Sequence, residues 1–388
     1  MNNSMIVFIL GQIIRLEGLL MIIPCLTSLI YQEHEIFAFL IVIISCLVIG
    51  TLMTLRKPAN QTIYLKEGCV ATAFSWILLS IFGCMPFVIS GEIPSFTNAL
   101  FETISGFTTT GASILSDVES MSHGMMLWRC FTHWIGGMGI VFFTIAVLPN
   151  MGGGDVKLFS AEATGLKIGK LHPRISTTAR WLWSIYSLLT ITCMAAYFFG
   201  GMGLFDALCH GLSTIGTGGF STHTASIAWF QSPRLQWIAT LFMFLASVNS
   251  TLLYLFFIKR RVRDVLHDDE LRCFLVIFFV AAFSIMGILM YADHLDFTTA
   301  LRSAFFNTAS LQSTTGFSDE DFMKWHPTIW LILSLISIIG ACAGSTSGGL
   351  KCVRVLMVWR LTKAEFKKML HPHAVLPVRI NNTVITSQ

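Results

Sequence analysis

Threonine, serine and glycine recur at fixed positions in three short stretches of the chain. The stretches are 99–111 (ALFETISGFTTTG), 207–219 (ALCHGLSTIGTGG) and 304–316 (AFFNTASLQSTTG). In each stretch a serine follows the first alanine by six residues, and a glycine follows that serine by six. The last seven residues of each stretch carry no charge. Internal repetition fixes an architecture before other features do, so these stretches are the first candidates for a functional site.

These residue types are suited to holding a dehydrated monovalent cation. Small residues let backbones converge so that carbonyl oxygens replace the water shell of an ion, and glycine takes backbone angles that other residues avoid. No carboxylate or histidine lies in loops 108–111, 216–219 and 313–316, which favours an alkali cation over a divalent one. The candidate ligands are Thr109, Thr110 and Gly111, then Gly216, Thr217, Gly218 and Gly219, and finally Ser313, Thr314, Thr315 and Gly316.

A simpler explanation is that glycine, serine and threonine only permit close helix packing, as small residues do in membrane helices. Three copies in one register favour the ion site over this alternative.

The composition is that of an integral membrane protein. Of the 388 residues, 54% are hydrophobic and 12% are charged, and the mean hydropathy is +0.71. Soluble domains are about a quarter charged, so this chain has too few charges to cover a water-facing surface. The ten cysteines include no Cys-x-x-Cys pair, which argues against a disulfide framework or a zinc site. We expect no cleaved signal peptide, because no small-residue cleavage site follows the first apolar run.

Eight apolar runs are long enough to cross a bilayer, which takes about 20 residues. They lie at 5–30, 36–55, 69–90, 124–149, 181–200, 234–258, 273–292 and 328–361. Basic residues follow the even-numbered runs, so the N-terminus is expected to be cytoplasmic and the three stretches to lie on the opposite side. There Glu102, Asp117 and Asp206 are expected to raise the local cation concentration. The basic loop from Lys157 to Arg180 is expected to contact lipid head groups or a cytoplasmic partner.

This arrangement predicts an all-α integral membrane protein built from repeated helix–pore loop–helix units. A helix pair at 1–57 precedes pore repeats at 58–150, 175–263 and 264–361, and a cytoplasmic tail at 362–388 follows. Each repeated stretch is expected to be a half-helix that runs into a polar loop. Such non-helical backbone is tolerated at membrane depth when it is buried in protein or lines water.

The last apolar run is interrupted between Gly340 and Gly349 by four glycines and three serines or threonines. Each interior glycine costs a helix about 1 kcal/mol relative to alanine. We interpret this segment as an unwound gate on the cytoplasmic side of the third loop. Its proposed residues are Gly344, Ser345, Thr346, Ser347, Gly348, Gly349 and Lys351. The alternative is a continuous, closely packed helix.

Charged and polar side chains inside apolar segments are further candidates. Arg15 and Glu17 lie in the first run, which precedes the repeats, so we expect a structural or subunit-contact role for them. His133 is followed by glycines at 136, 137 and 139, which favours close helix contact over proton transfer. Three equivalent half-helix positions are polar and are expected to brace the loops or to face a water-filled vestibule. They are Glu102, His210 and Asn307.

Five longer strings carry a family resemblance. They are SGFTTTGAS (105–113), HWIGGMGI (133–140), LFSAEATG (158–165), STIGTGGFSTH (213–223) and GACAGSTSGGLK (340–351). With them the chain resembles a TrkH-type subunit of the Trk/Ktr/HKT superfamily of potassium transporters over nearly its whole length. The resemblance implies a K⁺-channel-like pore of four pseudo-repeats, an intramembrane loop at 340–349, a homodimer and a cytoplasmic nucleotide-binding subunit that gates it.

The chain departs from the family pattern in its number of loops. The family has four pore loops, and this sequence has three. A fourth glycine would fall at about residues 415–425, one repeat further on. We therefore expect a truncated or frameshifted product, or a fourth quarter that is supplied elsewhere.

Together these features predict potassium uptake through a carbonyl-lined pore in the bacterial inner membrane, with K⁺ as the transported ion. Two alternatives stay open. One is a non-conducting subunit that assembles or docks a regulator. The other is a proton- or sodium-coupled symporter, because broken helices also mark secondary transporters. The preference for K⁺ or Na⁺ is open as well. We expect membrane lipid but no nucleic acid as a partner. We expect no enzymatic activity, because no metal-ligand cluster, nucleophile–base pair or nucleotide motif stands out.

Overall fold

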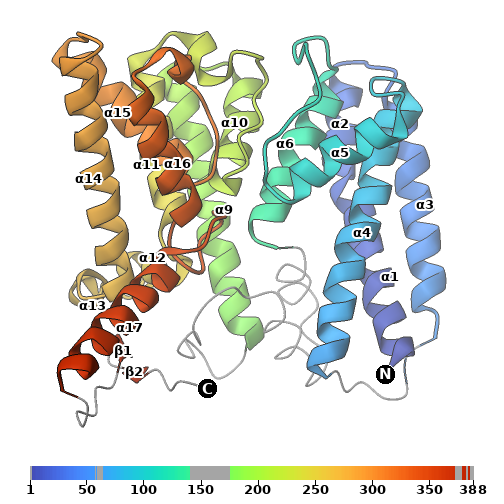
Figure 1. Cartoon of the computed structure of the whole chain (residues 1–388). Helices are drawn as coiled ribbons and strands as arrows, with labels where there is room; N and C mark the ends of the chain where they lie inside the picture. Colours follow the sequence, from blue (N-terminus) through green and yellow to red (C-terminus); the bar gives the residue numbers. More distant parts are fainter. Residues whose placement is uncertain are drawn as a thin grey trace. The chain divides into compact units, whose positions relative to one another are not determined.

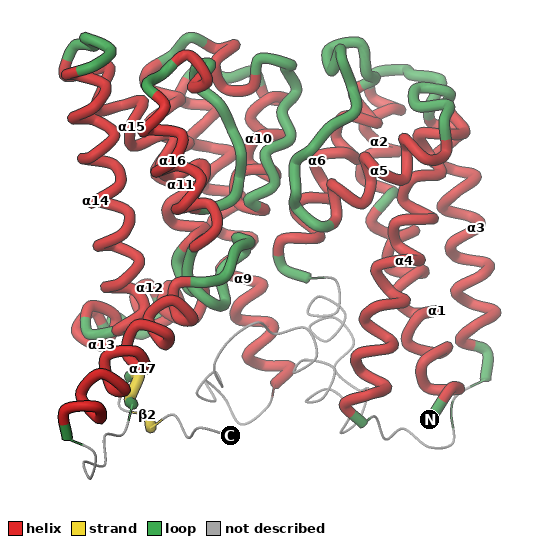
Figure 2. Tube along the Cα trace, viewed as in Figure 1, coloured by secondary structure: helices red, strands yellow, loops and turns green. Residues whose placement is uncertain are grey.

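The computed structural model describes residues 2–56, 58, 64–139, 175–371, 378–381 and 383–384. Helices dominate these residues (Figure 2), which confirms the all-α prediction. The strands described are β1 (Arg379–Ile380) and β2 (Thr383–Val384), which pair antiparallel. Most of the predicted basic loop, the string 158–165 and the end of the fourth apolar run lie outside the described residues.

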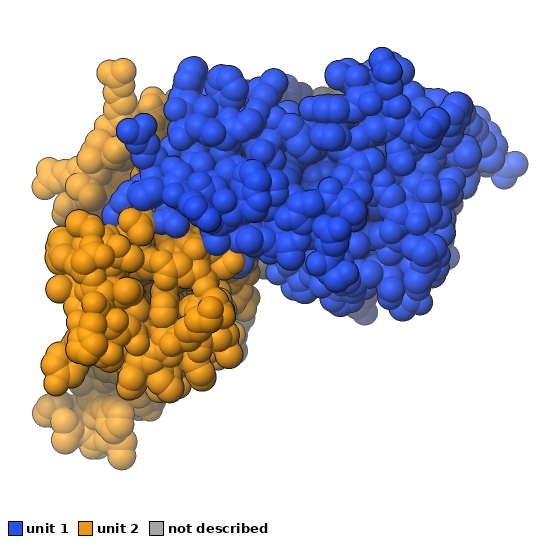
Figure 3. Space-filling view, turned by 90° about the horizontal axis from the view of Figure 1, so that it is seen from above, with its two compact units in different colours: residues 1–238, 315–317 blue, residues 239–314, 318–388 orange. Residues whose placement is uncertain are grey.

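The chain divides into two compact units (Figure 3). Unit 1 comprises Met1–Ile238 and Thr315–Phe317, and unit 2 comprises Ala239–Thr314 and Ser318–Gln388. The chain passes from one unit to the other inside α11 (Pro233–Ser247) and again on either side of Thr315–Phe317, where the third repeated stretch ends. The predicted division into a helix pair, three repeats and a tail is of a different kind and stays a prediction.

Unit 1 contains the helices of the first two repeated stretches. They are α1 (Asn3–Leu20), α2 (Ile22–Ile30), α3 (Ile36–Thr54), α4 (Leu65–Ser90), α5 (Phe96–Phe107), α6 (His123–Gly137), α9 (Ile175–Gly200), α10 (Leu204–Gly216) and the 3-10 helix η2 (Ser226–Phe230). Figure 1 shows α1, α3 and α4 side by side, and these three helices pack against one another. The short helix α5 packs against α4 and α6, and α10 packs against α6 and α9.

Unit 2 contains the third stretch and the interrupted last run. Its helices are α12 (Ser250–Phe257), α13 (Val262–Leu266), α14 (Asp269–Tyr291), α15 (Phe297–Gln312), η3 (Phe322–Lys324), α16 (Pro327–Ile339) and α17 (Cys352–Leu370), together with the end of α11 (Pro233–Ser247). The long helix α14 packs against α15, α16 and α17. Its first turn is capped by Asp268, whose carboxylate accepts from Leu271 N at 2.8 Å, as is typical of helix starts.

Five helices in the described part of the chain are long and apolar enough to cross a membrane. They are Asn3–Ile30, Ile36–Thr54, Lys66–Ser90, Arg180–Gly200 and Asp269–Tyr291. All five coincide with predicted runs. The predicted run 328–361 instead comprises the 13-residue helix α16, a non-helical segment from 340 to 351, and α17. The alternative of a continuous helix there is wrong.

The apolar run at 234–258 holds a break that the sequence analysis did not foresee. Its two helices, α11 and α12, are bent by 103°. The side chain of Asn249 caps α12 by accepting from Thr251 N at 2.8 Å, and such local side-chain bonds compete with helical ones. Backbone groups freed by the break bond to the other non-helical segment: Cys342 N donates to Ser247 O, and Ser250 N donates to Gly344 O.

Close backbone contact joins α1 to α3. A Cβ atom built on Gly50 would lie 2.4 Å from Arg15 Cγ and 2.7 Å from Gly11 O, both on α1. Arg15 therefore lays its aliphatic stem across Gly50, which agrees with the structural role expected for it. Glu17 is also buried in this unit, next to Gly83 of α4.

We predict that Gly50→Ala lowers the stability of the protein. The new methyl group has no room unless α1 and α3 separate, and such overpacking costs about 1–3 kcal/mol. The measurement is the thermal unfolding midpoint in detergent, followed by tryptophan fluorescence. Gly287→Ala on α14 is the matched control, because a Cβ there meets no described heavy atom within 4 Å and gains helix propensity. A Gly50→Ala protein as stable as Gly287→Ala would contradict the tight contact.

Candidate functional site

The three repeated loops share one backbone conformation. A threonine two residues before the final glycine has a positive φ in each loop: 55° at Thr109, 53° at Thr217 and 58° at Thr314. The final glycines also have positive φ angles. They are Gly111 (76°), Gly219 (87°) and Gly316 (82°). Positive φ in a β-branched residue is strained, by about 1–3 kcal/mol each. The same strain at three equivalent positions indicates that the surroundings impose it.

The serine of the repeat closes the end of each half-helix in unit 1. Thr110 N donates to Ser105 O at 2.9 Å, and Gly218 N donates to Ser213 O at 3.0 Å. Thr109 N donates to Gly106 O at 3.0 Å in the same turn. This pattern is a Schellman cap, in which glycine normally occupies the left-handed position. Here threonine occupies that position. The fixed Ser-x5-Gly spacing therefore corresponds to a helix cap, followed by a loop that ends at a glycine with positive φ.

The loops meet at their glycines. A Cβ atom built on Gly111 would lie 2.0 Å from Gly218 O, and one built on Gly219 would lie 2.0 Å from Thr315 O. All these residues belong to unit 1. A Cβ on Gly316 would meet no described heavy atom within 4 Å. The first loop thus contacts the second, and the second contacts the end of the third at Thr315. Neither contact leaves space for a side chain at its glycine.

Helix α6 supports the first two loops. A Cβ on Gly136 would lie 2.0 Å from Phe107 O, and one on Gly137 would lie 2.9 Å from Gly216 Cα. The ring of His133 lies against the second loop, since a Cβ on Gly218 would be 2.1 Å from its Cγ. The predicted close contact of this glycine-rich helix is therefore confirmed.

Three equivalent side chains brace the segments that leave the loops. Glu102 accepts from Ser113 Oγ at 2.9 Å. His210 Nε2 lies 2.9 Å from Ser221 Oγ, and Asn307 Nδ2 donates to Asp319 Oδ1 at 2.7 Å. Each of the three is buried. Bracing is therefore the observed role, and the alternative of a side chain facing a water-filled vestibule is wrong for all three.

A buried ion pair behind the first loop was not found from the sequence. Arg129 Nε lies 2.6 Å from Glu102 Oε1, and both side chains are almost inaccessible to solvent. Removing one member of a buried pair typically costs about 3–5 kcal/mol, because the other charge is left uncompensated. The sequence did contain a sign of this pair. Arg129 is a charged residue inside an apolar run, and such residues are often functional, as was argued for Arg15 and Glu17.

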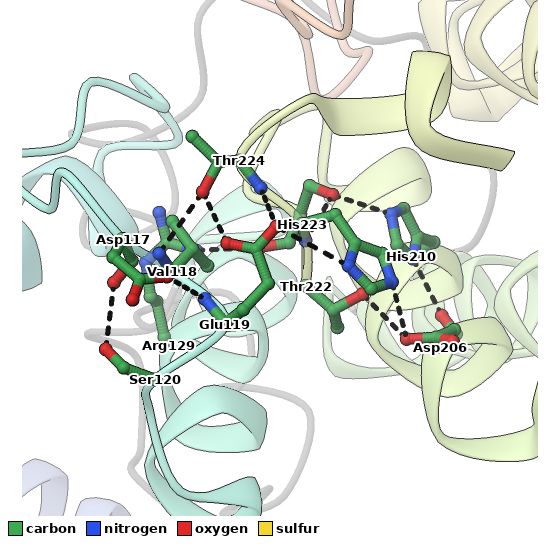
Figure 4. Close-up of polar contacts among 11 residues, drawn as sticks. Asp117, Val118, Glu119, Ser120, Arg129, Asp206, His210, Thr222, His223 and Thr224 are labelled. Carbon is green, nitrogen blue, oxygen red and sulfur yellow. Dashed lines mark hydrogen bonds and ion pairs between the residues drawn. The ribbon is translucent and has the colours of Figure 1, made fainter.

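Carboxylates and a histidine join the segments that leave the first two loops (Figure 4). Thr224 donates to Glu119 through its backbone N at 2.9 Å and its hydroxyl at 2.5 Å, and these bonds lower the pKa of Glu119 to about 2. The ring of His223 lies between Glu119, at 3.7 Å from Nδ1, and Asp206, at 3.8 Å from Nε2.

In unit 2, burial raises the pKa of Asp319 to about 6.

The segment from 340 to 351 is held by hydrogen bonds within unit 2. Gly348 N donates to Thr314 Oγ1 of the third loop at 2.6 Å, and Ala343 N donates to Glu270 at 2.5 Å. The buried ammonium of Lys351 donates to Ser347 O. Ser345 and Ser347 share a bond at 2.9 Å. The predicted gate residues thus contact the third loop directly, through Thr314. Glu270 is a second residue that the sequence analysis missed.

No cluster of three or more potential metal-ligating His, Cys, Asp or Glu side chains occurs among the described residues. What converges instead is neutral backbone at the ends of short helices, in a protein with at least five apolar helices of membrane-spanning length. This combination defines a class of α-helical membrane proteins in which short helices end in polar loops that contact one another. Whether the predicted ligands bind an ion stays a prediction.

Comparison with known proteins identifies the family. The chain belongs to the TrkH family, whose model is described as a cation transport protein and matches residues 35–388. The chain is 36% identical over 401 residues to the Trk system potassium uptake protein TrkG of Escherichia coli (strain K12), covering all of this chain and 81% of the relative. It is 35% identical to the Trk system potassium uptake protein TrkH of Halomonas elongata, covering 99% and 80%.

The crystal structure of the potassium transporter TrkH from Vibrio parahaemolyticus matches with a TM-score of 0.88 at 31% sequence identity. The match covers 99% of this chain and 80% of that chain. The family resemblance in the sequence is therefore confirmed, and the chain is a multi-pass membrane protein.

We predict that Gly111→Ala destabilises the protein far more than Gly91→Ala. Both glycines have positive φ angles, 76° and 82°, so alanine costs about 1–2 kcal/mol of backbone strain at either site. Only at Gly111 does the new Cβ collide with a carbonyl oxygen, while at Gly91 it meets no described heavy atom within 4 Å. Unfolding midpoints of the two variants measure the difference. Equal midpoints would mean that the loops do not meet at Gly111.

Proposed function

We propose that this chain carries K⁺ across the bacterial inner membrane, and that backbone carbonyls of the three loops replace the water shell of the ion. The observation that carries the proposal is the meeting of Gly111 with Gly218 and of Gly219 with Thr315, without room for a side chain. Family membership supports it, as do relatives named for potassium uptake. Transport, rather than catalysis, is the activity that those names describe.

The charges around the loops suit a monovalent cation. The half-helices α5, α10 and α15 all end at their loops, so the negative ends of their dipoles face the place where an ion would sit. No carboxylate enters the loops themselves, and binding by neutral dipoles stays weak enough for release. Asp117, Glu119 and Asp206 lie on the segments flanking the loops, where they raise the local cation concentration.

The segment 344–349 with Lys351 serves as the gate in this proposal. Its support is the bond from Gly348 N to Thr314 Oγ1, which couples it to a loop that holds the ion. Non-helical backbone of this kind is tolerated at membrane depth only inside protein or beside water. A shift of the segment would therefore be felt at the third loop.

Orientation and partners complete the proposal. Basic residues at the ends of the even-numbered runs support a cytoplasmic N-terminus. Exposed apolar side chains such as Leu52, Ile191 and Val276 face membrane lipid. The relatives are named as parts of a Trk system, which supports a protein that works with other subunits. We propose a homodimer and a cytoplasmic nucleotide-binding subunit as its partners.

One observation favours a second candidate function, a subunit that assembles but does not conduct. Gly316 faces open space among the described residues, whereas Gly111 and Gly219 each face a neighbouring loop. A further loop would fit beside Gly316 and complete a ring. The second candidate requires that this loop be absent from the working protein.

Rubidium uptake tests the proposal. We expect the purified chain, in liposomes loaded with potassium chloride, to take up ⁸⁶Rb⁺ faster than empty liposomes, and Gly111→Ala to abolish the difference. Uptake equal to that of empty liposomes would support the non-conducting candidate. Uptake that stops when proton and sodium gradients are removed would support a coupled symporter. Competition by unlabelled K⁺ and Na⁺ ranks the two ions.

Loss of the Thr314 hydroxyl should loosen the gate. Thr314→Val removes the acceptor for Gly348 N. One such hydrogen bond contributes about 1.4 kcal/mol, which corresponds to a factor of about ten. We therefore expect ⁸⁶Rb⁺ uptake in the absence of any regulator to rise about tenfold. Thr217→Val is the matched control. Both hydroxyls donate to the preceding carbonyl, but only Thr314 bonds to the gate. Equal uptake by both variants would argue against the coupling.

A further inference from the structure

Arg129 connects the segments that leave the first and second loops. It lies on α6, and its guanidinium makes two hydrogen bonds to different parts of unit 1. Nε donates to Glu102 Oε1 of α5 at 2.6 Å, and Nη1 donates to Ser221 O at 3.0 Å. Ser221 lies only two residues after Gly219.

The partners of Arg129 are themselves tied to the loops. Glu102 accepts from Ser113 Oγ at 2.9 Å and from Ile114 N at 3.1 Å, two and three residues after the first loop. The hydroxyl of Ser221 pairs with His210 on α10. Through these bonds one guanidinium is linked to two half-helices and to both outgoing segments. Arg129, Glu102, His210 and Ser221 are buried.

The guanidinium of Arg129 lies over an aromatic ring. Arg129 Cζ lies 3.7 Å from the centroid of the Phe220 ring. The same ring stacks on His133, with centroids 4.0 Å apart and an interplanar angle of 22°, and His133 Nδ1 lies 3.0 Å from Ser213 Oγ. Phe220 directly follows Gly219, so the second loop is held on the same α6 helix that carries Arg129.

We propose that Arg129 is a positioning residue for the ion site: it sets the spacing between the first two loops and thereby the affinity for K⁺. This inference rests on the proposed function. The planar fork of arginine can bond to a carboxylate and a carbonyl in fixed directions, whereas lysine offers a compact point charge on a flexible stem. Because Glu102 balances the charge, the pair adds no net repulsion to a cation beside the loops.

A purely structural ion pair makes a different prediction. Such a pair affects the stability of the protein without ions, but it leaves the affinity for K⁺ unchanged. The two roles are separated by measuring affinity and stability in the same experiment. A ligand that binds only the folded protein raises the unfolding midpoint as its concentration increases.

The experiment is a titration of the unfolding midpoint of the full chain with potassium chloride, with choline chloride keeping the ionic strength constant. We expect Arg129→Lys to weaken the apparent K⁺ affinity about tenfold, because one charge-assisted hydrogen bond is lost. Phe220→Leu keeps every charge and should weaken the affinity less. The double variant Glu102→Gln with Arg129→Gln removes both charges together, so that neither is left buried alone, and should match Arg129→Lys.

Arg360→Gln is the matched control. It removes another arginine–carboxylate pair, Arg360 of α17 with Asp269 of α14 at 2.9 Å, and both residues belong to unit 2. This variant should keep the wild-type K⁺ affinity even if its midpoint without K⁺ falls. Wild-type affinity in Phe220→Leu and in either Arg129 variant would overturn the positioning role. A wild-type protein whose midpoint does not respond to K⁺ would instead overturn the ion site, and the positioning role with it.

Discussion

The close approach of three polar loops is the constraint on which the rest of this structure depends. Carbonyl oxygens of neighbouring loops occupy the positions where side chains would begin at Gly111 and Gly219. Backbones this close together require glycine. They also require rigid supports, because the carbonyl dipoles of neighbouring loops repel one another. The capped half-helices, the glycine face of α6 and the three polar braces all serve this one contact.

The backbone strain of the loops and the burial of charged side chains behind them are each offset by neighbouring hydrogen bonds. Threonine in the left-handed region is unfavourable, but each such residue follows a capped half-helix. Charges are rare in the interior, and the Arg129–Glu102 pair is accompanied by further hydrogen bonds to Ser113 and Ser221. A buried pair is tolerated when its remaining lone pairs and protons are satisfied in this way. Polar chemistry is thus concentrated behind the loops rather than in them.

Two breaks in long apolar segments supply hydrogen-bond partners for each other's backbone groups. The bend between α11 and α12 frees backbone groups at Ser247 and Ser250, and the 340–351 segment supplies their partners through Cys342 and Gly344. In a lipid environment an unpaired backbone group costs several kcal/mol. Each break therefore makes the other permissible. The same segment also bonds to Thr314 of the third loop through Gly348 N.

The sequence by itself determined the membrane class, five of its eight predicted spans and the register of the three loops, because apolar length and fixed Gly and Ser spacing are local properties. It also located the interruption after Ile339, since four clustered glycines cannot sustain a helix. Tertiary structure decided what the loops meet and what holds them. Arg129 bonds to a carbonyl 92 residues away along the chain, and Asn249 caps a bend whose freed backbone groups find partners beyond Gly340. Contacts between residues so far apart in the sequence depend on how the helices pack. They therefore cannot be predicted from the local pattern of residue types.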